Sequence, residues 1–186
     1  MRQIIRMVVV LTGVCVGSGF LLSFSYKKLS CRIEQNQKRK VQERIFSLID
    51  NAASFTLRDI GGRTLYTVRD KSHHILGYCI IEEGNGYQGK IKILVGIKPD
   101  LKTLWGIDII EHQETPGLGA RIGEAHFKRQ FKDLISVPQI DLVKRSPASH
   151  NEVQAISGAT ISSRAVVKIV NKAIGFFKKN LGNGKD

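Results

Sequence analysis

A run of 20 residues without a charged side chain, Met7 to Tyr26, constrains this chain more than any other feature. A helix of about 20 apolar residues is long enough to cross the hydrocarbon core of a bilayer. The alternative is a cleaved signal peptide, but no A-x-A pattern follows the run and its apolar core is too long. The sequence therefore predicts an uncleaved N-terminal membrane anchor over residues 1–28.

The charges that flank this run give a conflicting indication of its orientation. Arg2 and Arg6 precede it, and a larger set of cations follows it: Lys27, Lys28, Arg32, Lys38, Arg39 and Lys40. Counted by the positive-inside rule, this bias favours a C-terminal domain in the cytoplasm. The 38–40 cluster lies well beyond the span and a whole domain follows it, so the charge count decides the topology only weakly.

The rest of the chain reads as one α+β domain behind a connecting helix. Apolar residues at helical spacing in 29–55 predict that helix and its packing on the domain: Val41, Ile45, Leu48, Ile49 and Ala52. Residues 56–186 form the predicted domain, with strands at Thr64–Val68, Ile75–Glu82, Ile91–Ile97, Thr103–Glu111 and a short Ile140–Val143. Helices are predicted at Ile122–Leu134 and 161–180. Alternating apolar residues favour a mixed, mainly antiparallel sheet with packed helices.

The strongly basic composition points to an anionic partner. Lys and Arg number 29 against 16 Asp and Glu, which leaves a net charge of +13 and suits nucleic acid, lipid headgroups or a phosphate-bearing cofactor. No RNA-binding aromatic signature or zinc-finger spacing accompanies the charge, so nucleic acid is not predicted. Cys15, Cys31 and Cys79 form no C-x-x-C, which argues against a metal site in this chain alone. A Cys31–Cys79 disulfide stays open.

Small residues directly before the last helix predict an anion site. Gly158 allows a tight turn, and Thr160 stands where a helix takes its N-cap. The free N–H groups of the helix would then lie beside hydroxyls of Ser157, Thr160, Ser162 and Ser163, an arrangement suited to phosphate. The simpler alternative is that Thr160 only caps its helix.

A second segment, His112–Gly119, directly follows a predicted strand. Two glycines around Leu118, preceded by Pro116, predict a rigid loop whose backbone approaches a ligand closely. Glu114 and Thr115 add an acceptor and a hydroxyl. Taken alone, the pattern also fits a plain strand-to-helix turn.

Three blocks in a fixed order carry a family resemblance: Gly86-Tyr87-Gln88-Gly89 leading into Ile91–Gly96, then His112–Gly119, then Ser157–Thr160. Together with the N-terminal anchor they resemble the G subunit of the Rnf ion-translocating oxidoreductase complex. Its FMN-binding domain is shared with the C subunit of the sodium-pumping NADH:quinone oxidoreductase. The likeness covers essentially the whole chain.

The resemblance implies FMN bound covalently, its phosphate esterified to Thr160 by a separate flavin transferase that uses FAD. It places Glu114, Thr115, Gly117 and Leu118 along the ring or ribityl chain, and Lys144 or Arg145 near the phosphate or the ring. Tyr87 either stacks on the ring or is an aromatic residue at a strand end. The phosphate would lie at Ser157, Gly158, Ala159, Ser162 and Ser163. One departure concerns attachment: the family has Asp six residues before the acceptor, where this chain has Gln154, and Glu152 is the nearest possible substitute.

The implied function is an electron relay rather than an independent catalyst, with no catalytic side chain or metal ligand of its own. Its partners would be other integral subunits that move Na⁺ or H⁺, in a bacterial or archaeal cytoplasmic membrane. The family places this domain on the extracytoplasmic face. Two alternatives remain open: a membrane-anchored flavin sensor or small reductase, and a basic non-redox module that binds anionic lipid or nucleic acid.

Overall fold

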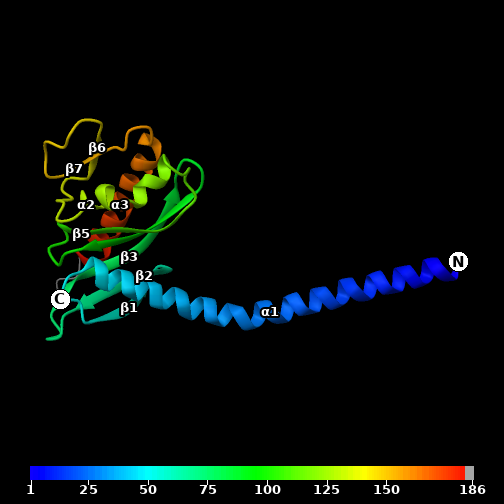
Figure 1. Cartoon of the computed structure of the whole chain (residues 1–186). Helices are drawn as coiled ribbons and strands as arrows, with labels where there is room; N and C mark the ends of the chain where they lie inside the picture. The colour runs from blue at the N-terminus through cyan, green and yellow to red at the C-terminus, as the bar shows by residue number, and fades with distance from the viewer. Residues whose placement is uncertain (183–186) are drawn as a thin grey trace. The chain divides into compact units, whose positions relative to one another are not determined.

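The structure is a computed structural model that describes residues 1–182, apart from side chains at 21–22, 24–25 and 27–38. It consists of two units, Met1–Glu43 and Arg44–Asp186. The elements in chain order are α1 (Arg2–Leu48), β1 (Ser54–Ile60), β2 (Arg63–Arg69), β3 (Ile75–Asn85), β4 (Lys90–Ile97), β5 (Leu104–His112), the 3-10 helix η1 (Gly119–Gly123), α2 (Ala125–Arg129), β6 (Asp141–Val143), β7 (Glu152–Gln154) and α3 (Thr160–Leu181) (Figure 1).

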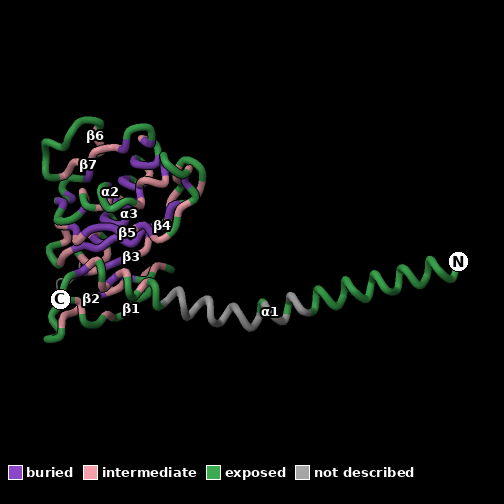
Figure 2. Tube along the Cα trace, viewed as in Figure 1, coloured by how far each residue is buried: buried purple, intermediate pink, exposed green. Residues whose placement is uncertain are grey.

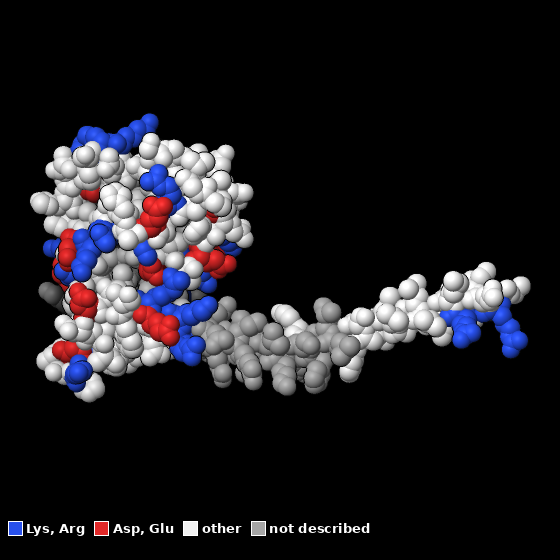
Figure 3. Space-filling view, viewed as in Figure 1, with Lys and Arg blue, Asp and Glu red and all other residues white. Residues whose placement is uncertain are grey.

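The first unit is helical throughout. Its segment Arg2–Phe20 has a mean hydropathy of 1.7 and is, among the described residues, the one stretch of helix long and apolar enough to cross a membrane. Figure 3 shows charged side chains only near the N-terminus of this part of α1. The sequence leaves a disulfide between Cys31 and Cys79 open. The side chain of Cys31 is not among those that the structure describes, and Cys79 is fully buried in β3.

The second unit is built on a five-stranded antiparallel sheet in the order β1-β2-β3-β4-β5. Each strand pairs with the next along the chain, so short turns suffice for every connection. The strongly buried strands are β3, β4 and β5 (Figure 2). A separate parallel pair, β6 and β7, lies beyond them in sequence. The predicted mainly antiparallel sheet with packed helices is confirmed.

Helix α3 covers one face of this sheet and contacts β3 and β4. Side chains at alternate positions of β4, Ile93, Val95 and Ile97, point into the same core as the apolar stripe of α3. That stripe consists of Val166, Ile169, Val170, Ala173, Ile174 and Phe177, all buried as the spacing predicts. Burial of each large side chain stabilises the fold by about 1.5–3 kcal/mol relative to exposure.

The last turn of α1 packs on the opposite face. Ile45 and Ile49 are fully buried, and Leu48 lies over Gly96 and Gly106, where any side chain would crowd it. Arg44 donates to Asp108 and to the carbonyl of Ile109. The predicted packing of the connecting helix on the domain is therefore confirmed for its final turn.

Two predicted helices have the wrong bounds. The connecting helix predicted through residue 55 ends at Leu48, because Asn51 adopts a left-handed φ of 62° and stops it. Residues Ser54–Ile60 form the edge strand β1, which the sequence does not predict. The helix predicted over Ile122–Leu134 is instead η1 and α2, because Glu124 between them is extended, with ψ at 148°.

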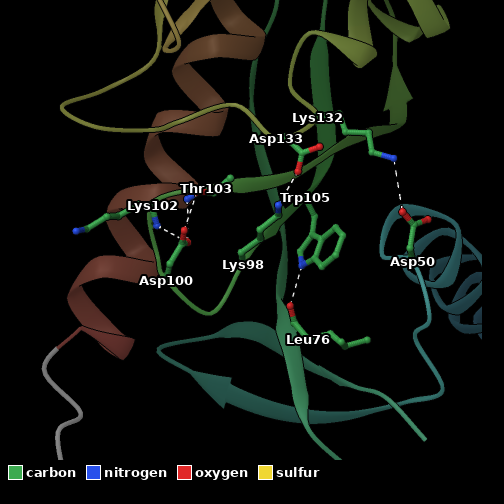
Figure 4. A network of polar contacts seen from close by, with 9 residues as sticks. All are labelled: Asp50, Leu76, Lys98, Asp100, Lys102, Thr103, Trp105, Lys132 and Asp133. Carbon is green, nitrogen blue, oxygen red and sulfur yellow. Dashed lines mark hydrogen bonds and ion pairs between the residues drawn. The ribbon is translucent and has the colours of Figure 1, made fainter.

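The turn before β5 is fixed by side chains (Figure 4). Asp100 accepts hydrogen bonds from the backbone of Lys102 and Thr103 and from the Thr103 hydroxyl. The Trp105 indole donates to the Leu76 carbonyl at 2.8 Å, and Lys98 lies 5.0 Å from the Trp105 ring centroid. These contacts hold the N-terminal end of β5, while its C-terminal end leads into the candidate site.

Candidate functional site

A pocket of about 410 Å³ opens where three distant segments meet. They are the turn between β3 and β4, the loop after β5 and the first turn of α3. The lining residues are Tyr87, Glu114, Thr115, Leu118, Gly119, Gly158, Ala159, Thr160, Ile161 and Ser162. The two segments that the sequence singled out therefore form one cavity, together with the tyrosine of the Gly-Tyr-Gln-Gly turn.

The loop after β5 is rigid for the reason its sequence suggests. Leu118 N donates to the Thr115 carbonyl at 3.2 Å across Pro116-Gly117. Gly117 has a φ of +75°, and proline followed by such a glycine is the arrangement of a type II turn. The Thr115 hydroxyl donates to Gln88 Oε1 at 2.8 Å, which fastens the loop to the β3–β4 turn.

The start of α3 differs from the prediction in one respect. Thr160 is the first helical residue rather than the cap, and the cap position belongs to Ala159, which has no side-chain capping bond. The Ser163 hydroxyl ties the first turn to the segment before it, accepting from Ile156 N and donating to the Ala159 carbonyl, both at 3.0 Å. In the described part of the chain the Thr160 hydroxyl makes no hydrogen bond, so it stays available at the pocket wall.

Glu114 is the buried charge of the pocket, with 4% of its surface exposed. Oε1 accepts from the backbone N–H of Tyr87 at 2.9 Å and of Gln88 at 3.1 Å, and Oε2 accepts from the Ser162 hydroxyl. Burial alone raises the pKa of this carboxyl, but the hydrogen bonds from Ser162, Gln88 and Tyr87 outweigh it and lower the pKa below its usual value. Glu114 is therefore ionised at neutral pH.

Two glycines make room for this carboxylate. A Cβ at Gly86 would collide with Glu114 Oε1, and one at Gly119 would lie 2.6 Å from both Glu114 Oε2 and the Ser162 hydroxyl. Any other residue at either position would push the carboxylate off its donors.

Eight of the predicted site residues line the pocket, and four do not. Ser157 and Gly117 are exposed outside it, Ser163 is buried behind the helix start, and Lys144 lies after β6, away from the pocket lining. Arg145, the other predicted cation, binds Glu152 at 2.8 Å.

Two lining residues, Gly119 and Ile161, are absent from the set predicted by sequence. Gly119 is visible in the sequence as the last residue of the motif. Ile161 fits the periodicity of the helix, but it is 55% exposed. With Tyr87 at 67% and Leu118 at 49% exposed, it forms an apolar rim contributed by all three segments.

The segment before Ser157 is held by its own contacts. Gln154 lies in β7 and exchanges hydrogen bonds with the Gln130 side chain, through its N–H at 2.7 Å and its carbonyl at 3.3 Å. Both carboxylate oxygens of Glu152 accept hydrogen bonds from Arg145, and one also accepts from Ala148 N. Among the residues that the structure describes, no three His, Cys, Asp or Glu side chains lie close enough to hold a metal ion.

Comparison with known proteins identifies the pocket-bearing part of the chain. Residues 86–175 match the FMN-binding domain family. Two solved structures share the fold at 24% sequence identity. Shewanella oneidensis NqrC has a TM-score of 0.56 over 61% of this chain and 55% of its own. The C subunit of the Na⁺-translocating NADH-quinone reductase from Parabacteroides distasonis has a TM-score of 0.53 over 71% and 63%.

Two relatives match most of the chain. The G subunit of the ion-translocating oxidoreductase complex of Methanosarcina acetivorans is 31% identical over 97% of this chain and 98% of its own length. The G subunit of the proton-translocating ferredoxin:NAD⁺ oxidoreductase complex of Clostridium ljungdahlii is 33% identical over 88% and 86%. This chain belongs to the family of G subunits of the ion-translocating oxidoreductase complexes.

Proposed function

We propose that this protein is a membrane-anchored electron-transfer subunit that carries FMN on Thr160 through a phosphoester bond. It relays electrons between redox centres of an ion-translocating ferredoxin:NAD oxidoreductase. The names of the relatives and the match to the FMN-binding domain family support the cofactor class and the complex. The family resemblance implies Thr160 as the attachment residue, and its place in the pocket supports this.

The observation that carries the attachment is the position of the Thr160 hydroxyl. It lies on the pocket wall at the first residue of a 22-residue helix. The first N–H groups of a helix have no intrahelical acceptor, and the helix dipole favours an anion there. A phosphate joined to Thr160 Oγ would keep one negative charge at this position and would receive these donors.

The remaining lining residues fit a flavin. Bound flavin supplies one- or two-electron redox chemistry, which the protein tunes by position and charge. Leu118, Ile161 and Tyr87 offer apolar surface to a planar ring at the pocket mouth, where an electron partner can approach. Gly158 has a φ of +79°, a conformation that favours glycine, and a Cβ added there would lie 3.4 Å from the Leu118 side chain.

We further infer that a separate flavin transferase attaches the cofactor from FAD, and that the domain lies on the extracytoplasmic face. The family resemblance supports both, whereas the flanking charges favour the opposite topology. Protease treatment of intact spheroplasts tests the second point: digestion of the domain is expected, and protection of the domain until the cells are lysed would overturn it.

In-gel fluorescence after denaturation tests the attachment. The chain is co-expressed with a flavin transferase, and ultraviolet fluorescence is expected for the wild type and for Ser149→Ala, an exposed serine outside the pocket lining. Thr160→Ala is expected to lose it. A fluorescent Thr160→Ala band would refute the assignment of the acceptor.

Co-purification from the native membrane separates the relay from its alternatives. The relay is expected to bring several integral subunits with it, whereas a flavin sensor or small reductase would purify alone. A colourless protein that binds anionic lipid or nucleic acid only at low salt would support the non-redox module instead. On the face seen in Figure 3, basic and acidic side chains of the domain are interspersed, which does not favour that module.

A further inference from the structure

Glu114 is an unusual residue for a pocket that receives a phosphate-bearing cofactor. It is a buried carboxylate, and within the described residues no Lys, Arg or His side chain forms an ion pair with it. All its hydrogen-bond donors are neutral: backbone N–H groups of the β3–β4 turn and the Ser162 hydroxyl. Its negative charge is therefore stabilised without being neutralised.

The same side chain joins all three walls of the pocket. Glu114 lies in the loop after β5, and its partners Gln88 and Ser162 lie 26 and 48 residues away in sequence. Gly86 and Gly119 leave the space that the carboxylate occupies. Loss of the carboxylate would leave the buried Ser162 hydroxyl and two partly buried backbone N–H groups without this acceptor, and an unsatisfied buried donor costs more than its hydrogen bond contributes.

The family resemblance places Glu114 along the flavin ring or its ribityl chain. Three of the lone-pair positions on its two oxygens are already occupied by protein donors, so the geometry points to a different role. We propose that Glu114 is a positioning residue: it holds the three pocket walls together and maintains a fixed negative charge beside the flavin, which lowers the reduction potential. This inference rests on the proposed function, because it requires flavin in the pocket.

The physical reason is that reduction adds negative charge to the ring. A fixed anion nearby disfavours that step by Coulomb repulsion, and the effect is larger in a partly buried site than in water. A low potential suits a carrier that accepts electrons from a strong reductant and passes them on.

The test uses the full chain, co-expressed with a flavin transferase, and three variants. Glu114→Gln keeps the shape and an acceptor for the backbone donors but removes the charge, whereas Glu114→Ala removes both. The matched control is Glu82→Gln, at a second buried carboxylate. Glu82 contacts α3 through Lys172 and Glu114 contacts it through Ser162, ten residues earlier in the same helix. That separation is roughly 15 Å along the helix axis at 1.5 Å per residue, and Glu82 is not among the residues that line the pocket, whereas Glu114 is.

The expected results separate positioning from charge. Glu114→Ala is expected to lower the flavin-bearing fraction roughly tenfold, because the free-energy cost of leaving one buried group unsatisfied corresponds to about that factor. Glu114→Gln is expected to retain flavin with a midpoint potential less negative than that of the wild type. Glu82→Gln is expected to leave the potential unchanged. Potentiometry follows only the flavin-bearing fraction, so partial incorporation suffices.

Three results would overturn the inference. They are full flavin incorporation in Glu114→Ala, an unchanged potential in Glu114→Gln, and a folded Glu114→Gln chain that takes no flavin at all. A wild-type chain without flavin would instead overturn the proposed function, and this inference with it.

Discussion

Two carboxylates of this domain are equally buried and both contact α3, yet they are held in opposite ways. Glu114 is 4% exposed and Glu82 is 5% exposed. Glu114 receives only neutral donors, among them Ser162 in the first turn of the helix. Glu82 lies between two cations, with Lys172 Nζ at 2.5 Å and Arg63 Nη1 at 3.0 Å.

The difference separates a functional region from a structural one. Glu82 lies in β3 and lines a cleft of about 500 Å³ together with Gly62 and Arg63 of the β1–β2 hairpin. Its charge is compensated there, and Arg63 also lies 5.0 Å from the Phe176 ring centroid, which fastens the hairpin to α3. The charge of Glu114 has no such compensation among the described residues and faces the pocket. A protein keeps an uncompensated buried charge mainly where that charge has a task.

The largest expected effect comes from crowding Glu114. Gly119→Ala places a methyl group 2.6 Å from Glu114 Oε2 and Ser162 Oγ, and overpacking of this kind costs about 1–3 kcal/mol of unfolding free energy. We expect a loss near the upper end of that range, together with loss of flavin. Urea unfolding measures the first and fluorescence the second.

Gly175→Ala in α3 is the matched control. It has no atom within 4 Å of its added methyl group, and alanine is the better helix former by about 1 kcal/mol, so the variant is expected to be slightly more stable. Equal stability losses in both variants would refute the steric argument.

A smaller effect is expected at the compensated carboxylate. Lys172→Ala leaves Glu82 with Arg63 alone. Because Lys172 is half exposed, we expect a loss of about 1 kcal/mol rather than the several that a fully buried pair would lose. Flavin incorporation should be unchanged. Lys168→Ala, an exposed position on the same helix, is the control, and a variant at Lys172 as stable as this control would show that Glu82 needs only one cation.

The smallest effect concerns pH. The pKa of Glu114 is lowered in the folded chain, so its contribution to stability is complete above the unfolded pKa of about 4.3 and is lost as the pH falls through the lower folded value. The stability difference between wild type and Glu114→Gln should therefore shrink from pH 6 to pH 3. Asp70, Asp100 and Glu152 also have lowered pKa values but are common to both proteins. Denaturant unfolding at several pH values measures this, and a constant difference would contradict it.

The pocket could largely be predicted from the sequence because its walls are short motifs with special backbone needs. Gly158 and Gly117 have positive φ values of the kind that such motifs require. The role of Glu114 could not be predicted, because its donors come from segments far away in the chain. Lys144 is not among the residues that line the pocket, so its predicted place near the phosphate or the ring stays a prediction.

Two further errors have local causes. Strand β1 is exposed at five of its seven positions, so it lacks the alternation by which strands are recognised. The sequence predicts Thr160 as a cap because threonine favours that position. In the structure Ala159 occupies it, with φ at −133° and ψ at 38°.

The mass of the mature chain from its native host tests the central claim most directly. Intact-mass and fragment spectra are expected to show one FMN phosphoester per chain on the peptide that begins the last helix, with the modified residue at Thr160. A chain of unmodified mass, or the same adduct on another hydroxyl, would contradict the account.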